Sequence, residues 1–171
     1  RRGQRFTNES GPYDNMPYAA YNQPGKVYAQ IFDAGMPEDV QRFHTIGCSV
    51  TTRMNPQRQL DIFEEKIEKG LAFKADTLEE LADKLGFIGE DKETFLATCA
   101  RYDELYDMQE DVDFGKPAYR ISALRTAPFY GYWLGACLLT TNQGVLVDEN
   151  ARVLDEGRRP MEGLYAAGDA T

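Results

Sequence analysis

Hydrophobic residues recur at helical spacing in the middle of the chain, most clearly between Ala75 and Gly86. The apolar positions of this stretch fall on one side of a helix and are Leu78, Leu81, Ala82 and Leu85. Thr77, followed three residues later by Glu80, forms a capping box at the start of the stretch, and Gly86 is a typical stop. The pattern therefore predicts a helix here.

A second helix is predicted from about Asp91 to Met108, because apolar and aromatic residues again return every three or four positions. Its buried face is expected to carry Phe95, Cys99, Tyr102 and Tyr106. The acidic stretch from Gln109 to Asp113 that follows is interpreted as a solvated turn.

Alternation and turn residues predict the other elements of the first two thirds of the chain. Lys26 to Asp33 alternates and is rich in β-branched and aromatic residues, which is typical of a strand covered on both faces. Helices are predicted after Pro37 and from Pro56 to Lys69, the second ended by Gly70. Ser10 to Gly25 is rich in Gly, Pro and Asn, so a long loop or several turns are expected there.

The C-terminal part of the chain is expected to be β-structure. Gln143 to Asp148 and Arg152 to Leu154 should pair as a hairpin, with a further turn from Gly157 to Gly163. A short apolar run, Leu164 to Ala167, leads into Gly168-Asp169, a frequent way of bringing backbone up to a cofactor. Helices and strands interleave irregularly, so the predicted fold class is α+β.

Composition and charge argue against several classes of function. A formal net charge of −9 over 171 residues disfavours a nucleic-acid partner and an anionic membrane surface. No apolar run approaches the roughly 20 residues of a membrane span. The opening Arg-Arg-Gly-Gln-Arg is not followed by an apolar stretch, so no signal peptide is expected in this segment. The expected location is cytoplasmic, or exported if a longer parent chain carries a signal.

Residues that bind metals are scarce. Cys48, Cys99 and Cys137 lie far apart and are expected to be reduced packing residues. His44 is the only histidine, so neither a histidine-based triad nor a multi-histidine metal site is expected. No metal is predicted.

Three segments together resemble a family of flavoproteins that contains soluble fumarate reductases, urocanate reductases and ketosteroid dehydrogenases. The first is Gly-Gln-Arg-Phe-Thr-Asn-Glu at residues 3–9, similar to the family's G-K-R-F-x-N-E. The second is the predicted helix pair, which opens with Ala-Asp-Thr-Leu-Glu-Glu-Leu-Ala at residues 75–82 and continues to Cys-Ala-Arg-Tyr-Asp at 99–103. The third runs from Pro128 to Ala170 and ends in Gly-Leu-Tyr-Ala-Ala-Gly-Asp, close to the family's G-L-Y-A-A-G-E.

The resemblance implies a fragment of an FAD-dependent reductase or dehydrogenase acting on CH–CH bonds. Residues 1–139 would form the substrate-capping domain, with 1–9 at its junction with the FAD domain. Residues 140–171 would be a β-hairpin and strand stub of the FAD-binding domain. The Gly-rich dinucleotide fingerprint is absent from the sequence, as expected if it lies in polypeptide N-terminal to this fragment. The implied partners are the remainder of the flavoprotein chain, a small-molecule substrate, and an unidentified electron donor or acceptor.

The position after Asn8-Glu9 distinguishes the classes of substrate that the family implies. Fumarate reductases carry a proton-donating arginine a few residues on, whereas ketosteroid dehydrogenases carry N-E-S-x-P-Y-D with an active-site tyrosine. This chain has Asn-Glu-Ser-Gly-Pro-Tyr-Asp, which makes Tyr13 the candidate catalytic residue. A neutral tyrosine hydroxyl, with a reference pKa near 10, suits a ketone or enone better than a dicarboxylate, which requires cationic ligands.

The third segment supplies the other candidate site residues. Leu138-Leu139-Thr140 stands where fumarate reductases present a histidine, which disfavours a dicarboxylate and makes Thr140 a candidate substrate ligand. The aromatic and apolar surroundings, which include Phe129, Tyr130, Trp133 and Leu139, favour a larger and flatter substrate, with Tyr130 as a second candidate ligand. The resemblance assigns cofactor binding to Thr141, Gly144, Gly168 and Asp169, although Gln143 replaces the first glycine of the family's Gly-Gly pair.

Three hypotheses follow. The first is hydride transfer between flavin and a conjugated carbonyl compound, such as an enone or ketosteroid-like substrate. The second keeps the flavin chemistry but reduces a small unsaturated acid of the fumarate or acrylate type. The third is a binding module that is catalytically silent as an isolated fragment.

Overall fold

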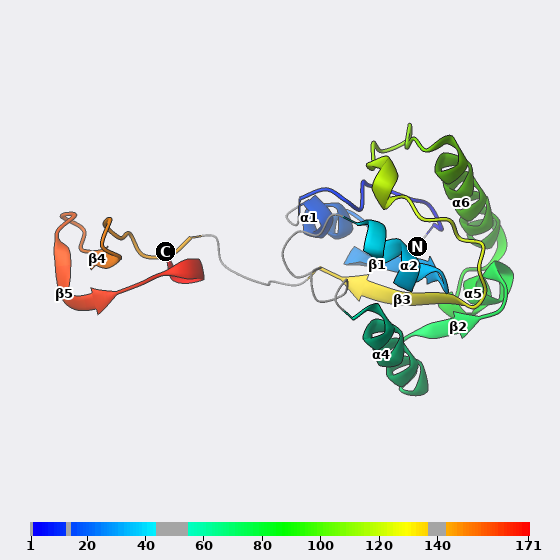
Figure 1. The fold of residues 1–171 in the computed structure, drawn as a ribbon, viewed down its shortest axis with the longest axis horizontal. Helices are drawn as coiled ribbons and strands as arrows, with labels where there is room; N and C mark the ends of the chain where they lie inside the picture. The colour runs from blue at the N-terminus through cyan, green and yellow to red at the C-terminus, as the bar shows by residue number, and fades with distance from the viewer. Residues whose placement is uncertain (1, 13–14, 44–54, 137–142) are drawn as a thin grey trace. The chain divides into compact units, whose positions relative to one another are not determined.

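The computed structural model describes residues 2–12, 15–43, 55–136 and 143–171. The chain divides into two compact units, Arg1–Ala136 and Cys137–Thr171. Each unit has its own sheet, and the elements of each are labelled in Figure 1. The α+β class predicted from the sequence is confirmed.

A three-stranded antiparallel sheet forms the centre of the first unit (Figure 1). β1 (Val27–Asp33) pairs with β3 (Phe129–Gly135), from Val27 opposite Gly135 to Asp33 opposite Phe129. β2 (Phe73–Ala75) pairs with the other side of β3, which is therefore the central strand. The strand predicted from Lys26 to Asp33 is thus confirmed.

α5 (Leu78–Leu85) and α6 (Gly89–Met108) cover one face of this sheet. The buried residues packed between them and the sheet are Ala75, Leu81, Ala82, Leu85, Phe87, Phe95, Cys99 and Phe129. Gly131 of β3 lets α5 approach closely, because a Cβ there would meet Leu81 and Leu85 of that helix, and Ile31 of β1, at 3.1 to 3.3 Å.

Both predicted helices of this pair are confirmed. Thr77 caps α5 by accepting a hydrogen bond from the Glu80 N–H at 3.1 Å, and Gly86 ends the helix with a φ of 81°. α6 differs from the prediction on its buried side: Leu105 is buried, while Tyr102 and Tyr106 are only half-buried.

The opposite face of the sheet packs against α4 (Pro56–Glu68) through aromatic side chains. The ring of Phe63 lies 4.7 Å from that of Phe32 and 5.0 Å from that of Tyr132. The predictions of this helix and of the helix after Pro37, α2 (Met36–Arg42), are confirmed. η2 (Ala118–Arg120) is a single 3₁₀ turn.

The long loop predicted from Ser10 to Gly25 is wrong in its second half. α1 (Asn15–Tyr21) and η1 (Pro24–Lys26) occupy most of it. Pro17 lies in the first helical turn, where its missing N–H would have had no helical partner. Ala20 is fully buried, so this short helix depends on tertiary packing rather than on intrinsic propensity.

The second unit is a small antiparallel ribbon of β4 (Arg152–Leu154) and β5 (Pro160–Tyr165), followed by η3 (Gly168–Ala170). The predicted pairing of 143–148 with 152–154 is confirmed only as a bridge between Val147 and Val153. The turn predicted from Gly157 to Gly163 is wrong after Pro160, where β5 begins. The sequence pattern places the end of the turn at Gly163, but this residue lies inside β5, where it has a positive φ of 75°.

No helix in the described parts of the chain is both long enough and apolar enough to cross a lipid bilayer.

Candidate functional site

The N-terminal segment, residues 2–12, lies against the start of α6. Gly3 has a φ of 69°, and an added Cβ would meet the backbone of Asp91 and Phe95 at 2.5 to 2.8 Å. Only glycine accommodates both this backbone conformation and this close contact. The family-like motif at residues 3–9 is therefore held against the helix rather than projecting into solvent.

Arg5 lies between two carboxylates, and we call Arg5, Glu9 and Asp111 the N-terminal clamp. The guanidinium donates to Glu9 at 2.7 and 2.9 Å and to Asp111 at 3.0 and 2.6 Å. Both contacts are bidentate, the strongest geometry for such a pair. The clamp therefore joins residues 106 positions apart in the sequence.

Asp111 is the buried end of the clamp, and its side chain has no exposed surface. Besides Arg5, its carboxylate accepts hydrogen bonds from the backbone N–H groups of Asp113, Phe114 and Lys116 at 3.2, 3.1 and 2.9 Å. The prediction of a solvated turn is therefore wrong at this residue. A buried carboxylate is stable only when it is paired and hydrogen-bonded in this way.

The surroundings of the clamp favour its charged form. Burial by itself would raise the pKa of Asp111, but the hydrogen bonds from Arg5 and from the N–H groups of Lys116 and Phe114 outweigh it. The pKa of Asp111 therefore lies well below its usual range. Burial also opposes ionisation of Glu9, yet Arg5 and Lys116 lower the pKa of its carboxyl group. Both carboxylates are charged at neutral pH.

The residues before Tyr13 are fixed by further hydrogen bonds. The side-chain amide of Asn8 donates to the Gly115 carbonyl at 2.9 Å, and its oxygen accepts from the Ser10 N–H at 2.8 Å. Beyond the loop, the Asn15 N–H donates to the Pro12 carbonyl at 2.9 Å. Tyr13 itself lies outside the described residues, but the chain on both sides of it is anchored.

α1 and β3, the elements next in sequence to the candidate residues Tyr13, Thr140 and Thr141, contact each other. α1, which follows Tyr13 in the sequence, contacts β1 and β3. Figure 1 shows it at the end of the sheet where β3 finishes, and Gly135 there pairs with Val27. Thr140 and Thr141 follow β3 in the sequence and, like Tyr13, lie outside the described residues.

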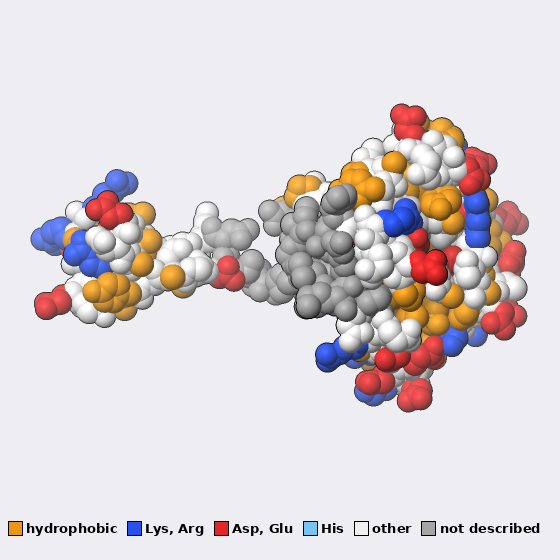
Figure 2. Space-filling model, viewed as in Figure 1, with side chains coloured by type: hydrophobic (Ala, Val, Ile, Leu, Met, Phe, Trp, Pro, Cys, Tyr) orange, Lys and Arg blue, Asp and Glu red, His pale blue; other side chains and the backbone are white. Residues whose placement is uncertain are grey.

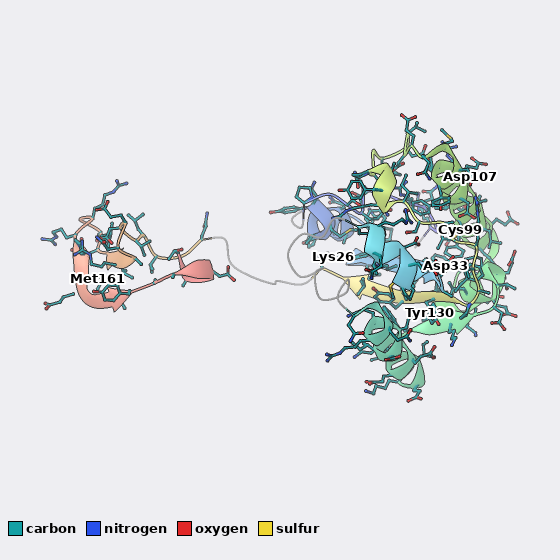
Figure 3. All side chains as sticks on the ribbon, in the orientation of Figure 1. Lys26, Asp33, Cys99, Asp107, Tyr130 and Met161 are labelled. Carbon is teal, nitrogen blue, oxygen red and sulfur yellow. The ribbon has the colours of Figure 1, made fainter. Side chains whose placement is uncertain are left out.

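Tyr130 is placed in the interior of the first unit. It is 5% exposed, and its ring stacks on that of Phe32 at 5.0 Å. Its hydroxyl lies 3.5 Å from Glu64 Oε1, which in turn accepts from Lys74 at 2.6 Å. Burial raises the pKa of Tyr130. Figure 3 shows it on the central strand, and its role as a substrate ligand stays a prediction.

Three of the candidate cofactor residues come together within the second unit. The Val145 N–H donates to the Ala170 carbonyl at 2.9 Å, and Gly144 has no room for a Cβ against the backbone of Ala170 and Thr171. Gly168 has a φ of 71° with open space where a Cβ would lie, and the adjacent Asp169 is exposed. An uncovered glycine backbone beside a carboxylate suits a polar group of a cofactor.

A cavity of about 650 Å³ lies along β1, the N-terminal segment and α6. Its volume is in the range of small-molecule sites. Glu9, Tyr102 and Lys116 line it, and Lys116 donates to the Tyr102 hydroxyl at 2.6 Å. One side of the clamp therefore borders the cavity.

The described residues include no group of three or more His, Cys, Asp or Glu side chains arranged to hold a metal ion. Cys99 is buried in the core, as expected for a packing cysteine. Cys48, Cys137 and His44 lie outside the described residues.

Comparison with known proteins gives consistent matches along the whole chain. The family described as FAD binding domain matches residues 1–171. The chain is 31% identical to an NADH:acrylate oxidoreductase of Vibrio harveyi, with all of this chain and 15% of that protein covered.

Solved structures with the same fold include a dehydrogenase and a reductase. A 3-ketosteroid delta1-dehydrogenase from Sterolibacterium denitrificans superposes with a TM-score of 0.64 at 26% identity, covering 99% of this chain and 32% of that one. A flavocytochrome c3 fumarate reductase superposes with a TM-score of 0.63 at 24% identity, covering 99% and 26%, and shows likeness of fold alone. This chain spans between 15% and 32% of the length of these three proteins.

Proposed function

The chain belongs to the FAD binding domain family, and from that premise we propose that it forms part of an FAD-dependent oxidoreductase acting on the CH–CH bond of a conjugated carbonyl compound. Its relatives include fumarate and acrylate reductases and ketosteroid dehydrogenases. The remainder of the flavoprotein chain would complete the site.

The two units would have different tasks. Residues 1–139 would cap the substrate, and residues 140–171 would return to the FAD-binding domain. The division of the chain after Ala136 supports this assignment. Gly144 packs closely against the backbone of Ala170 and Thr171, next to Gly168 and Asp169 in the sequence. This close packing of the candidate cofactor residues supports a cofactor-binding role for the second unit.

FAD, when bound, supplies the hydride chemistry. Gly144, Gly168 and Asp169 would hold it together with Thr141, and the Asp169 carboxylate would accept hydrogen bonds from cofactor hydroxyl groups. Thr140 and Tyr130 are proposed to contact the substrate.

Tyr13 is proposed as the residue that holds and moves the second proton. Its neutral hydroxyl can donate to, or accept from, a carbonyl compound without the cation that a dicarboxylate would need. The observation that carries this proposal is the Asn-Glu-Ser-Gly-Pro-Tyr-Asp sequence. Within it, Asn8 donates to the Gly115 carbonyl of the turn after α6, and Glu9 lies 3.5 Å from Lys116 of that turn. Such anchoring restricts where a side chain four residues further on can lie.

Reduction of a small unsaturated acid is the second candidate, favoured by the 31% identity to an NADH:acrylate oxidoreductase. Tyr13 in place of arginine and Thr140 in place of histidine count against it, because a carboxylate substrate needs positive partners.

The two candidates are separated by re-oxidation of the reduced flavin in the full-length flavoprotein under anaerobic conditions. We expect a ketosteroid-type enone to re-oxidise it at least about tenfold faster than acrylate or fumarate. Faster oxidation by either acid would instead support the second candidate. A purified full-length protein without flavin absorbance would favour a catalytically silent binding module.

A further inference from the structure

Three side chains of the Arg-Phe-Thr-Asn-Glu motif, Arg5, Asn8 and Glu9, contact the same short turn. We call residues 109–116, which follow α6, the exit turn. Arg5 donates to Asp111, Asn8 donates to the Gly115 carbonyl at 2.9 Å, and Glu9 lies 3.5 Å from Lys116. The exit turn therefore serves as the anchor of the N-terminal segment.

Asp111 organises this anchor from within. Its two oxygens accept from Arg5 and from three backbone N–H groups of the exit turn, so one side chain fixes the turn and the segment together. The rings of Tyr102 and Phe114 lie 5.0 and 4.9 Å from the Arg5 guanidinium and enclose it. Few alternative arrangements satisfy this many polar groups at once.

The connection from the clamp to Tyr13 is short. Glu9 precedes Tyr13 by four residues, and the chain between them is folded back by the Gly11 N–H to Asn8 carbonyl bond at 3.2 Å. Because so few residues separate them and a turn joins them, a change in the position of Glu9 should also change the position of Pro12.

We propose that Asp111 is a positioning residue: through Arg5 and Glu9 it holds residues 8–12, the segment of the chain that leads to Tyr13. The inference rests on the proposed function for its catalytic consequence, but the placement of the loop can be tested separately. Asp111 does not touch the reacting atoms in this account, and its effect is transmitted by Arg5.

The exit turn also supplies a matched control. Asp113 pairs with Arg101 through the same bidentate geometry, at 2.9 and 3.1 Å. These side chains are 33% and 42% exposed, and neither partner belongs to the N-terminal segment. Asp113→Asn thus removes an aspartate–arginine pair from the same turn and leaves in place the side chains of the clamp and the backbone hydrogen bond from residue 113 to Asp111.

The first test is hydrogen exchange by mass spectrometry on the full-length flavoprotein. Asp111→Asn is expected to raise exchange of amides in residues 8–17 by about tenfold or more, while α5 stays protected as in the wild type. Arg5→Lys keeps the positive charge but loses the bidentate guanidinium contacts, so it should also raise exchange in residues 8–17. Asp113→Asn should leave exchange there unchanged. Unchanged exchange in residues 8–17, or an equal rise in α5, would overturn the proposal.

The second test is turnover in the flavin-loaded full-length protein. Asp111→Asn should lower kcat by about tenfold or more with little change in KM and an unaltered flavin spectrum, because a misplaced proton donor impairs the chemical step. If kcat falls only in proportion to the fraction of Asp111→Asn that is unfolded, a positioning role is contradicted. If the wild type turns over no conjugated substrate, the proposed function fails, while the exchange result still decides the placement of the loop.

Discussion

A tyrosine keeps its proton at neutral pH, because its reference pKa is near 10. At the residue scale this property separates Tyr13 from the arginine of the fumarate reductases: an uncharged hydroxyl can serve a ketone without attracting a carboxylate. The structure adds an anchor on each side, Asn8 before Tyr13 and the Asn15 N–H after it, and does not describe Tyr13 itself. The catalytic role of Tyr13 remains a prediction.

Tyr13→Phe in the full-length flavoprotein should lower turnover by about 10²- to 10⁴-fold, the usual contribution of a positioned acid or base. Flavin should stay bound, since Tyr13 is not among the proposed cofactor residues. Tyr18→Phe is the control, because Tyr18 lies on α1 and is 73% exposed. Steady-state kinetics with wild-type-like turnover for Tyr13→Phe would remove this residue from the mechanism.

Cys99 offers a prediction independent of the active site. Burial, reinforced by Asp103 and Glu79, raises the pKa of its thiol to about 12. The thiolate is the reactive form, so alkylation at pH 8 should be far slower in the folded chain than after unfolding. The measurement is labelling by iodoacetamide in a variant with Cys48→Ser and Cys137→Ser, followed by peptide mass spectrometry. Labelling of the folded protein as fast as the unfolded one would show that Cys99 is not buried.

At the scale of elements, agreement between sequence and structure follows the strength of the local signal. α5 was predictable because its apolar stripe, its Thr77 cap and its Gly86 stop agree with one another. α1 was not, since its seven residues include a proline and it depends on the packing of Ala20. β2 has only three residues, too few to show a period.

The buried state of Asp111 could not be predicted from its neighbours. Its local sequence is acidic and suits a solvated turn, whereas its main partner, Arg5, lies 106 residues away. Long-range pairing of this kind leaves no periodic signal in a single sequence. The Arg-Phe-Thr-Asn-Glu motif was recognisable as a family feature, but its partners in the exit turn emerge only from the fold.

The clamp predicts an acid-sensitive contribution to stability. The folded-state pKa values of Asp111 and Glu9 lie below their ordinary values, so the stabilisation is fully present above pH about 5 and is lost as pH falls through the folded pKa values. At neutral pH, Asp111→Asn should lower the free energy of unfolding by about 3 kcal/mol, the low end for a broken buried pair because Glu9 still neutralises Arg5.

The measurement is thermal unfolding followed by circular dichroism between pH 7 and pH 3. The stability difference between wild type and Asp111→Asn should shrink as the pH falls. Acid weakens the stabilisation that the charged Asp111 carboxylate gives the wild type, and the Asp111→Asn variant already lacks that stabilisation. The hydrogen bond from Arg101 also lowers the pKa of Asp113, so the difference between the wild type and Asp113→Asn should shrink in the same direction, but from a smaller starting value because this pair is exposed to solvent. A constant difference across this range would argue against the charged clamp.

At the scale of the whole molecule, the second unit has little interior of its own. Val153 is the one buried residue among those described in this unit, whereas Leu146 and Tyr165 are 53% and 64% exposed. Figure 2 shows hydrophobic side chains at its surface. Exposed apolar residues of this kind suit a surface that another part of a protein covers, and the chain spans 15% of the acrylate oxidoreductase and 32% of the ketosteroid dehydrogenase named above.

The isolated 171-residue chain is therefore expected to be colourless and inactive. The Gly-rich fingerprint for the ADP half of FAD is absent from the sequence, so Gly144, Gly168 and Asp169 would supply only part of the contacts. Gel filtration with added FAD, read by flavin absorbance of the protein peak, checks this. Stoichiometric retention of FAD by the isolated chain would contradict the proposed division of the cofactor site.

The central claim is that this chain serves flavin-dependent hydride exchange with a conjugated carbonyl compound. Its most direct test is a single turnover of the reduced full-length flavoprotein with one equivalent of a ketosteroid-type enone, excluding oxygen. We predict that flavin absorbance returns fully and that one equivalent of the saturated ketone is found by mass spectrometry. Flavin that stays reduced, or re-oxidation without saturated product, would contradict the account.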